Sequence, residues 1–337
     1  MRRIGLEGSW ELVRLFDGSR RPLTVPGDIM SALITSGELA DPYYAANELK
    51  AQWVGREDWL LVKEIDLDPD FLDLPRIFIE FEVLDTIAEL RVNGALLGRS
   101  SNMFERFRAE AREALRPGRN TIEVLLRSPE IEAEDRASRL SYALPYSEYP
   151  VTSPHRNLVR KAQCMAGWDW GPCLMTGGVY DGAALVGTSG ARIEYATTRA
   201  KRLGEGSWAL VVAVELSTIA AMDVEIEVEV SGERVALRAE LPPGASMREL
   251  SLTLSGIEPW WPAGYGAQPL YDMIVRCAGA LELRKRLGFR ELEVVAREDE
   301  IGKSMIFRVN GRDIFCKGSN WIPADALPSR WTRERLD

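Results

Sequence analysis

The stretch AELRVNG, residues 88–94, carries the pattern that decides the fold class. Apolar and polar residues alternate along Ala88–Val92, which is the period of a half-buried β-strand. The Asn93-Gly94 pair that follows is favoured in two-residue hairpin turns, because both central residues of a type I′ turn need positive φ. A second pair, Asn310-Gly311, follows a similar run. These stretches predict a chain built from β-hairpins.

The same alternation recurs along the rest of the chain. It predicts further strands at Ile77–Phe81, Thr121–Leu126, Leu210–Val214, Val224–Val230 and Met305–Val309. Helical patterns are few and short. The best is Asp28–Gly37, which has an aspartate able to cap its start and a glycine able to stop it. We therefore predict a mainly β protein.

Turn residues and composition divide the chain into three stretches. Residues 1–187 hold many short strands and an aromatic-rich irregular region, Tyr142–Gly178. Residues 188–289 show regular strands with the turn spacing of an immunoglobulin-like sandwich. Residues 290–337 carry a hairpin and then a strand-like run with a polar, aromatic tip. Because a parallel strand needs both faces covered, residues 313–337 either fold back on the sandwiches or belong to a missing domain, and we prefer the second alternative.

Composition excludes several classes of function. The formal net charge of −9 argues against nucleic-acid and anionic-membrane partners. The apolar runs are far shorter than the roughly 20 residues that span a bilayer. The N-terminus lacks the apolar segment of a signal peptide, so we expect a soluble, cytoplasmic protein. The four cysteines do not make a disulfide scaffold, although Cys164 and Cys173 flank one loop and are able to pair.

The single histidine, His155, limits the chemistry that the chain can perform. It cannot build a zinc site of the usual spacing, so we expect no metal and no cofactor. Nucleophilic serine and cysteine sites need an imidazole beside the nucleophile, and nothing around His155 resembles one. Carboxylates are therefore the expected acid, base and nucleophile if the protein belongs to a hydrolase.

The densest group of chemically useful residues is CMAGWDWGPC, residues 164–173. The rings of Trp168 and Trp170 suit the apolar C–H face of a pyranose. The carboxylate of Asp169 can accept two hydroxyl hydrogen bonds at once. This pattern favours a sugar-binding loop, and the alternative is a structural Trp-Asp-Trp corner. Just upstream, the cations Arg156, Arg160 and Lys161 either order this loop by holding carboxylates or are solvated surface charges.

A second group, GSNWIPAD at residues 318–325, places Asn320 and Trp321 at the end of a strand-like run. Barrel enzymes carry their active-site residues at the C-terminal ends of strands. The alternative is a buried tryptophan in a turn before Pro323. A third aromatic segment contains Trp260 and Trp261, which we expect to fill a seam between domains.

Taken in order, several segments resemble glycoside hydrolase family 2, and within it the β-mannosidase branch. They are DPYYAANELKAQWVGREDW (residues 41–59), Val92-Asn93-Gly94, Asn102-Met103-Phe104, RNLVRKAQC (156–164), WDWGP (168–172), PWWPAGYGAQPLY (259–271) and KGSNWIPAD (317–325). The resemblance covers essentially the whole chain. WDWGP and GSNWIPAD are its most specific motifs.

The resemblance implies a jelly-roll sugar-binding domain at 1–187, an immunoglobulin-like β-sandwich at 188–289, and the first strand or strands of a truncated (β/α)8 barrel at 290–337. It implies a retaining exo-glycosidase that releases terminal β-linked mannose with two glutamates. It maps Asp169 to contact with the terminal sugar, in a pocket that Trp321 also lines. Trp168, Trp170 and Asn320 complete the expected substrate-binding set.

We expect the two catalytic glutamates to lie outside this chain. In the family the acid/base glutamate follows an asparagine late in the barrel, and the only Asn-Glu here is Asn47-Glu48. A barrel needs about 250 residues. We therefore expect the chain alone to be inactive, with a β-mannoside glycan and the missing barrel as its partners. The alternatives are a stand-alone carbohydrate-binding module and a purely structural role without sugar contact.

Overall fold

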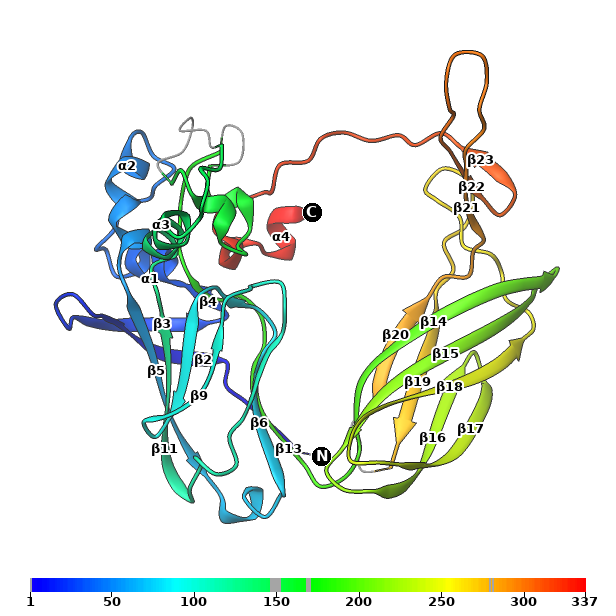
Figure 1. Cartoon of the computed structure of the whole chain (residues 1–337), viewed down its shortest axis with the longest axis horizontal. Coiled ribbons are helices and arrows are strands. Elements are labelled where there is room, and N and C mark those ends of the chain that lie inside the picture. The colour runs from blue at the N-terminus through cyan, green and yellow to red at the C-terminus, as the bar shows by residue number, and fades with distance from the viewer. Residues whose placement is uncertain (1, 146–152, 168–170, 279, 281) are drawn as a thin grey trace. The chain divides into compact units, whose positions relative to one another are not determined.

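The computed structural model describes residues 2–145, 153–167, 171–278, 280 and 282–337. The chain divides into two compact units. One comprises Arg2–Gly187 together with the C-terminal segment Trp321–Asp337, and the other comprises Thr188–Asn320 (Figure 1). Both are built mainly from antiparallel β-strands. Among the helices of the described residues, none has the length and apolar character needed to cross a membrane.

The first unit is a jelly-roll sandwich. Its strands are β1 (Arg2–Gly5), β2 (Gly8–Arg14), β3 (Arg20–Val25), β4 (Gly27–Asp28), β5 (Trp59–Leu67), β6 (Arg76–Phe81), β7 (Leu84–Asp85), β8 (Ala88–Val92), β9 (Ala95–Ser100), β10 (Phe107–Glu110), β11 (Gly118–Leu126), β12 (Gly178–Val179) and β13 (Ala183–Thr188). One sheet runs β1-β13-β6-β10, a larger one runs β3-β2-β5-β11-β8-β9, and a small one runs β4-β12-β7.

Alternation of side chains accounts for the core between these sheets. Along β8 and β11 every second residue is buried, which is the strand period that the sequence predicted. Leu61 from the larger sheet and Ile79 and Leu185 from the facing sheet are fully buried in one cluster. The β8–β9 turn is closed by Asn93 and Gly94 with φ of 50° and 85°. The predicted Asn-Gly hairpin is therefore confirmed.

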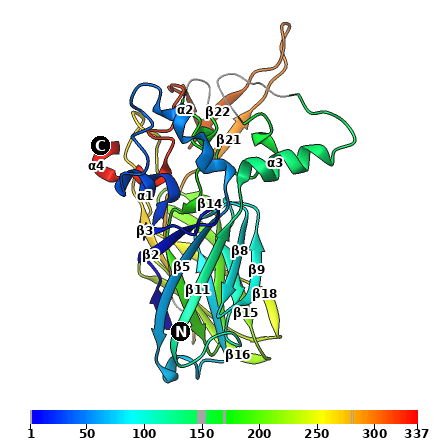
Figure 2. The same cartoon turned by 90° about the vertical axis from the view of Figure 1, so that its left-hand side faces the viewer.

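The helices of the first unit gather at one end of its strands, as Figures 1 and 2 both show. They are α1 (Ile29–Thr35), α2 (Asn47–Ala51), α3 (Pro129–Ser138) and α4 (Arg333–Leu336), with 3-10 turns η1 (Gln52–Arg56), η3 (Arg156–Leu158), η4 (Gln163–Met165) and η5 (Pro328–Arg330). The 3-10 turn η2 (Pro69–Phe71) follows the other end of β5. The predicted cap is present, since the carboxylate of Asp28 accepts the amide of Ser31 at 2.9 Å.

The second unit contains an immunoglobulin-like sandwich. Its strands are β14 (Arg192–Gly204), β15 (Ser207–Thr218), β16 (Met222–Val230), β17 (Glu233–Leu241), β18 (Gly244–Leu254), β19 (Tyr271–Cys277) and β20 (Leu283–Leu287). The sheets β14-β15-β18 and β17-β16-β19-β20 enclose a core in which Trp208 packs against Phe289 with ring centroids 5.6 Å apart.

A small sheet follows the sandwich within the same unit, formed by β21 (Leu292–Val295), β22 (Ile306–Val309) and β23 (Arg312–Ile314). Its hairpin turn places Asn310 and Gly311 at φ of 49° and 82°, as the sequence predicted. The side chain of Asn310 donates to the carbonyl oxygen of Trp260 at 3.0 Å. The tryptophan-rich segment therefore joins the sandwich to this small sheet.

Candidate functional site

The residues predicted to bind sugar are described only in part. Trp168, Asp169 and Trp170 lie outside the described residues. Trp321 is 73% exposed, so it is not the buried tryptophan of the structural alternative. Asn320 is exposed as well. The two ends of the 168–170 loop are described, and they show how the fold holds it.

The described residues on either side of the loop, 165–167 (the first arm) and 171–174 (the second arm), are paired with each other and form its base. Ala166 and Cys173 form an antiparallel bridge, and the amide of Leu174 donates to the carbonyl of Met165 at 2.7 Å. Ala166 and Cys173 are both buried. Gly167 leaves the bridge with φ of 82°, a conformation that favours glycine. The described residues before and after positions 168–170 thus meet at this bridge.

Side chains from α2 and η1 hold the returning arm. The Glu48 carboxylate accepts the Cys173 amide at 2.6 Å, and the Gln52 side-chain amide donates to the Cys173 carbonyl at 2.8 Å. Gln52 also donates to the carbonyl of Glu48 at 2.9 Å. Both polar groups of the Cys173 backbone are therefore satisfied by one short helical segment. Hydrogen bonds to a carboxylate are about twice as strong as neutral ones.

A buried lysine links the chain before the loop both to β7 and to the chain after the loop. Lys161 precedes the first arm and pairs with Asp85 of β7, and their side chains are 3% and 0% exposed. The Lys161 ammonium also donates to the carbonyl of Thr176, beyond the second arm, at 2.6 Å. Lys161 is therefore an ordering residue and not a solvated surface charge. Removing one partner of such a pair leaves the other charge buried without a counter-charge, which destabilises the fold.

The hydroxyl of Tyr180 completes this network by donating to Asp85 at 2.7 Å. Burial raises the pKa of the Asp85 carboxyl, and the neighbouring Lys161 opposes that rise. Burial, together with the nearby Asp85, raises the pKa of Tyr180 well above its ordinary value. The phenol therefore stays protonated at neutral pH and can act as a donor.

The Asn-Met-Phe motif contacts the first arm and the residues just before it. Asn102 and Arg160 form a parallel β-bridge, and the amide of Met103 donates a hydrogen bond to the carbonyl of Arg160 at 3.1 Å. Met103 is buried in one small cluster with Cys164 and Met165. Cys164 and Cys173 are both buried free thiols, so the disulfide that the sequence allowed is not formed.

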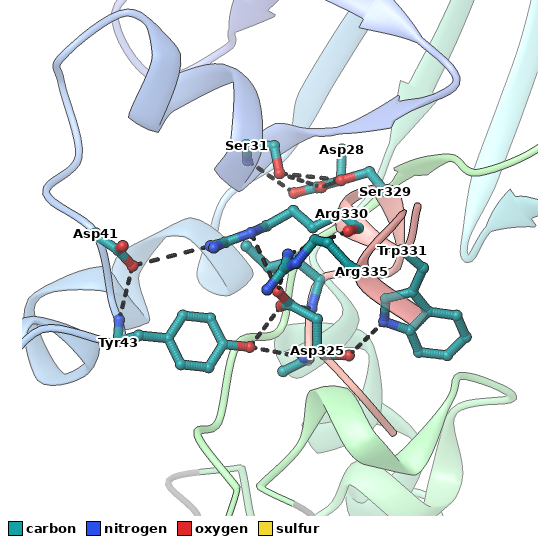
Figure 3. Close-up of polar contacts among 11 residues, drawn as sticks. Asp28, Ser31, Asp41, Tyr43, Asp325, Ser329, Arg330, Trp331 and Arg335 are labelled. Atoms are coloured by element: carbon teal, nitrogen blue, oxygen red, sulfur yellow. Dashed lines mark hydrogen bonds and ion pairs between the residues drawn. The ribbon is translucent and has the colours of Figure 1, made fainter. Parts of the chain in front are cut away.

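The C-terminal segment packs on the same end of the jelly-roll, as Figure 3 shows. Ala326 and Leu327 are part of the jelly-roll core. The buried carboxylate of Asp325 accepts the Tyr43 hydroxyl at 2.6 Å and pairs with Arg335 at 3.0 Å (Figure 3). Residues 321–337 thus fold back on the first sandwich, and their membership of a barrel stays a prediction.

The sequence indicates Lys161 as a residue that orders the loop, but not the residues that pair with it or hold the second arm. Glu48 lies in the Asp-Pro-Tyr-Tyr motif, which does not indicate its contact with the loop, and Asp85 and Thr176 carry no local motif. Their roles come from contacts between distant segments, such as Lys161 to Asp85. Within the described part of the chain, no three His, Cys, Asp or Glu side chains are grouped so as to hold a metal ion.

Comparison with known proteins shows which family the chain belongs to. The family model described as "glycosyl hydrolase 2 galactose-binding domain-like" matches residues 10–181, about half of the chain. β-Mannosidase from Bos taurus is 31% identical over 99% of this chain and 40% of its own length. β-Mannosidase B from Aspergillus niger is 33% identical over 90% of this chain and 36% of its own.

A solved structure is similar over nearly the full chain. The β-D-mannosidase from Dictyoglomus thermophilum superposes with a TM-score of 0.94 and 33% identity, covering 99% of this chain and 42% of that one. The chain thus spans about 40% of the length of the curated relatives it matches. It belongs to the glycosyl hydrolase 2 family, in which it resembles the N-terminal portion of β-mannosidases.

Proposed function

We propose that this chain is the sugar-binding, N-terminal part of a retaining exo-β-mannosidase that hydrolyses terminal, non-reducing β-D-mannose residues. The observation that carries the proposal is the likeness to a solved β-D-mannosidase, with 33% identity and a TM-score of 0.94 over 99% of the chain. Identity at this level along the whole chain is a stronger argument for shared function than a shared fold, because one fold hosts many activities.

In this proposal the loop that carries Asp169 binds the terminal mannose. The Asp169 carboxylate accepts two sugar hydroxyls, while Trp168 and Trp170 offer apolar faces to the ring. Trp321 and Asn320 line the same pocket. The base of the loop supports this role, since a binding residue must be held by packed and hydrogen-bonded neighbours to be effective. Glu48 and Lys161 supply such support at the described ends of the loop.

The chemical step belongs, in this proposal, to polypeptide outside the 337 residues. A retaining glycosidase needs two carboxyl groups about 5–5.5 Å apart across the scissile bond. The one Asn-Glu pair of the chain is Asn47-Glu48, and the Glu48 carboxylate is engaged by the Cys173 amide at the base of the loop. We therefore assign no catalytic carboxylate to this chain and treat a C-terminal barrel as its partner.

Activity measurements on two proteins test the proposal. The first is the 337-residue chain alone. The second is the same chain joined in frame to the remaining portion of the Dictyoglomus thermophilum enzyme. We expect hydrolysis of an aryl β-mannoside by the joined protein and none by the chain alone. Hydrolysis by the chain alone, after removal of contaminating enzymes, would contradict the assignment of the carboxylates.

Calorimetry of the chain with mannobiose separates this function from that of a stand-alone binding module. Because the pocket is completed by the barrel, half of it should bind weakly. A dissociation constant below about 10 µM, which corresponds to about 7 kcal/mol, would favour the stand-alone module instead.

A further inference from the structure

The carboxylate of Asp28 lies where three separate segments of the first unit meet. Asp28 is 1% exposed and stands at the start of α1. It accepts the Ser31 amide at 2.9 Å and the Ser31 hydroxyl at 2.6 Å, which are local capping bonds. It also accepts a hydrogen bond from the Thr176 hydroxyl at 3.0 Å. A fourth hydrogen bond comes from the Ser329 hydroxyl (Figure 3). Only the first two bonds are needed to cap the helix.

The two remaining bonds join distant parts of the chain. Thr176 lies three residues after Cys173, the end of the loop base, and its carbonyl accepts the Lys161 ammonium at 2.6 Å. Ser329 belongs to the C-terminal segment that begins at Trp321. The Asp28 carboxylate therefore joins the chain that follows the loop base to the C-terminal segment, which begins at the exposed Trp321.

The backbone beside Asp28 strengthens the connection to the chain that follows the loop base. Asp28 and Gly178 are register partners in the β4–β12 ladder, and the amide of Ile29 donates to the carbonyl of Gly177 at 2.9 Å. The amide of Met30 donates to the Thr176 hydroxyl at 3.1 Å. Residues 176–178, which follow the second arm, are thus bound along the start of α1, and they can move little without moving Asp28.

We propose that Asp28 is a positioning residue that holds the sugar-binding loop and the Trp321 segment at a common point. This inference rests on the proposed function for its purpose, but its geometry stands on the described contacts. A buried carboxylate is stable only when its acceptor positions are filled. Loss of the Ser329 hydroxyl leaves one acceptor position of the Asp28 carboxylate unfilled. Because Thr176 donates to the same carboxylate, a shift of that carboxylate weakens the Thr176 hydrogen bond as well.

Hydrogen exchange on the 337-residue chain tests this coupling. The reporters are the amide of Leu174, bonded to Met165 in the loop base, and the amide of Arg330, bonded to Leu327 in the C-terminal segment. We expect Ser329→Ala to accelerate exchange at Leu174 about tenfold, the scale of one hydrogen bond to a charged group. Reciprocally, Thr176→Val should accelerate exchange at Arg330 by a similar factor, because coupling between two sites is mutual.

Two control variants separate positioning from a general loss of stability. Thr176→Ser keeps the hydroxyl and should restore exchange at Arg330 to the wild-type rate. Tyr43→Phe removes a contact of the C-terminal segment that does not involve Asp28, so it should accelerate exchange at Arg330 and leave Leu174 unchanged. Urea unfolding of each variant corrects both reporters for changes in global stability.

An unchanged Leu174 rate in Ser329→Ala would overturn the inference, as would a Thr176→Ser variant that exchanges like Thr176→Val. The exchange readout contains no sugar, so it is independent of the proposed function. A chain that shows the coupling, but whose joined form hydrolyses no mannoside, would refute the proposed function and retain the coupling.

Discussion

The carboxylate of Glu48 accepts a hydrogen bond from the backbone amide of Cys173, with 2.6 Å between Oε1 and N. This bond ties α2 to the end of the loop that carries the expected sugar-binding residues. Cys173 is buried, so its amide has no water to replace a lost partner. The second arm of the loop base is therefore held by a residue that lies 125 positions away in the sequence.

We expect Glu48→Ala to loosen the loop base. The Cys173 amide should exchange at least about tenfold faster, since a hydrogen bond to a charged group contributes about 1.5–3 kcal/mol. Glu48→Gln keeps an acceptor oxygen and should have a smaller effect. Leu49→Ala, on the same helix but exposed, is the matched control and should leave the amide unchanged. Equal exchange rates in Glu48→Ala and Leu49→Ala would show that the bond does not hold the loop.

The Lys161–Asp85 pair should respond strongly to removal of the cation. Lys161→Met leaves the Asp85 carboxylate buried without its charge partner, and we expect a loss of about 3–5 kcal/mol in the free energy of unfolding. Arg160→Met, at the exposed neighbour, should cost less than about 1 kcal/mol. Adding Asp85→Asn to Lys161→Met should recover part of the loss. Urea titrations in which Lys161→Met is as mild as Arg160→Met would contradict this account.

Gly178 should tolerate no side chain. A Cβ atom built there lies 2.2 Å from the carbonyl oxygen of Gly27, which is backbone and cannot rotate away. We expect Gly178→Ala to lower the free energy of unfolding by about 2 kcal/mol or more. Gly182→Ala is the matched control, because its nearest neighbours lie at 3.6 Å. Thermal unfolding that gives the same midpoint for both variants would show that the β4–β12 ladder adapts freely.

The contact between Tyr43 and Asp325 should stabilise the folded chain less at alkaline pH than at neutral pH. Burial, together with the hydrogen bond to Asp325, raises the pKa of Tyr43 above its ordinary value near 10. A phenol whose pKa is raised on folding stabilises the folded chain below pH 10, and this contribution is lost as the pH rises further. We expect Tyr43→Phe to cost about 1–2 kcal/mol at pH 8 and less at pH 11. Urea titrations that give the same difference in the free energy of unfolding between the parent and Tyr43→Phe at both pH values would contradict this pH dependence.

Much of the fold could be predicted from the sequence, because the relevant signals are local. The run Ala88–Val92 is strand β8 with the same bounds, and Asp28 caps α1 as expected. The helix α3 was missed, although Ser128 caps it and Pro129 occupies its first turn. That Ser-Pro-Glu signal is present in the sequence, but the acidic run that follows offers little apolar periodicity.

The candidate site could be predicted only in outline. Aromatic and acidic residues in one loop indicated Asp169, but the supporting residues depend on long-range contacts. The bond from Thr176 to Asp28 spans 148 positions, and no local pattern indicates such a pairing. The sugar-binding roles of Trp168, Asp169, Trp170, Asn320 and Trp321, the cytoplasmic location and the division of the chain at residue 290 stay predictions.

The most direct measurement compares the hydrolysis of an aryl β-mannoside by two forms of the chain joined to the remaining portion of the Dictyoglomus thermophilum β-D-mannosidase. One form carries Asp169 and the other Asp169→Ala. Losing two charge-assisted hydrogen bonds to the sugar should lower kcat/KM at least about 100-fold, with the urea midpoint unchanged. An Asp169→Ala protein that keeps the parent kcat/KM would contradict the claim that this loop binds the sugar.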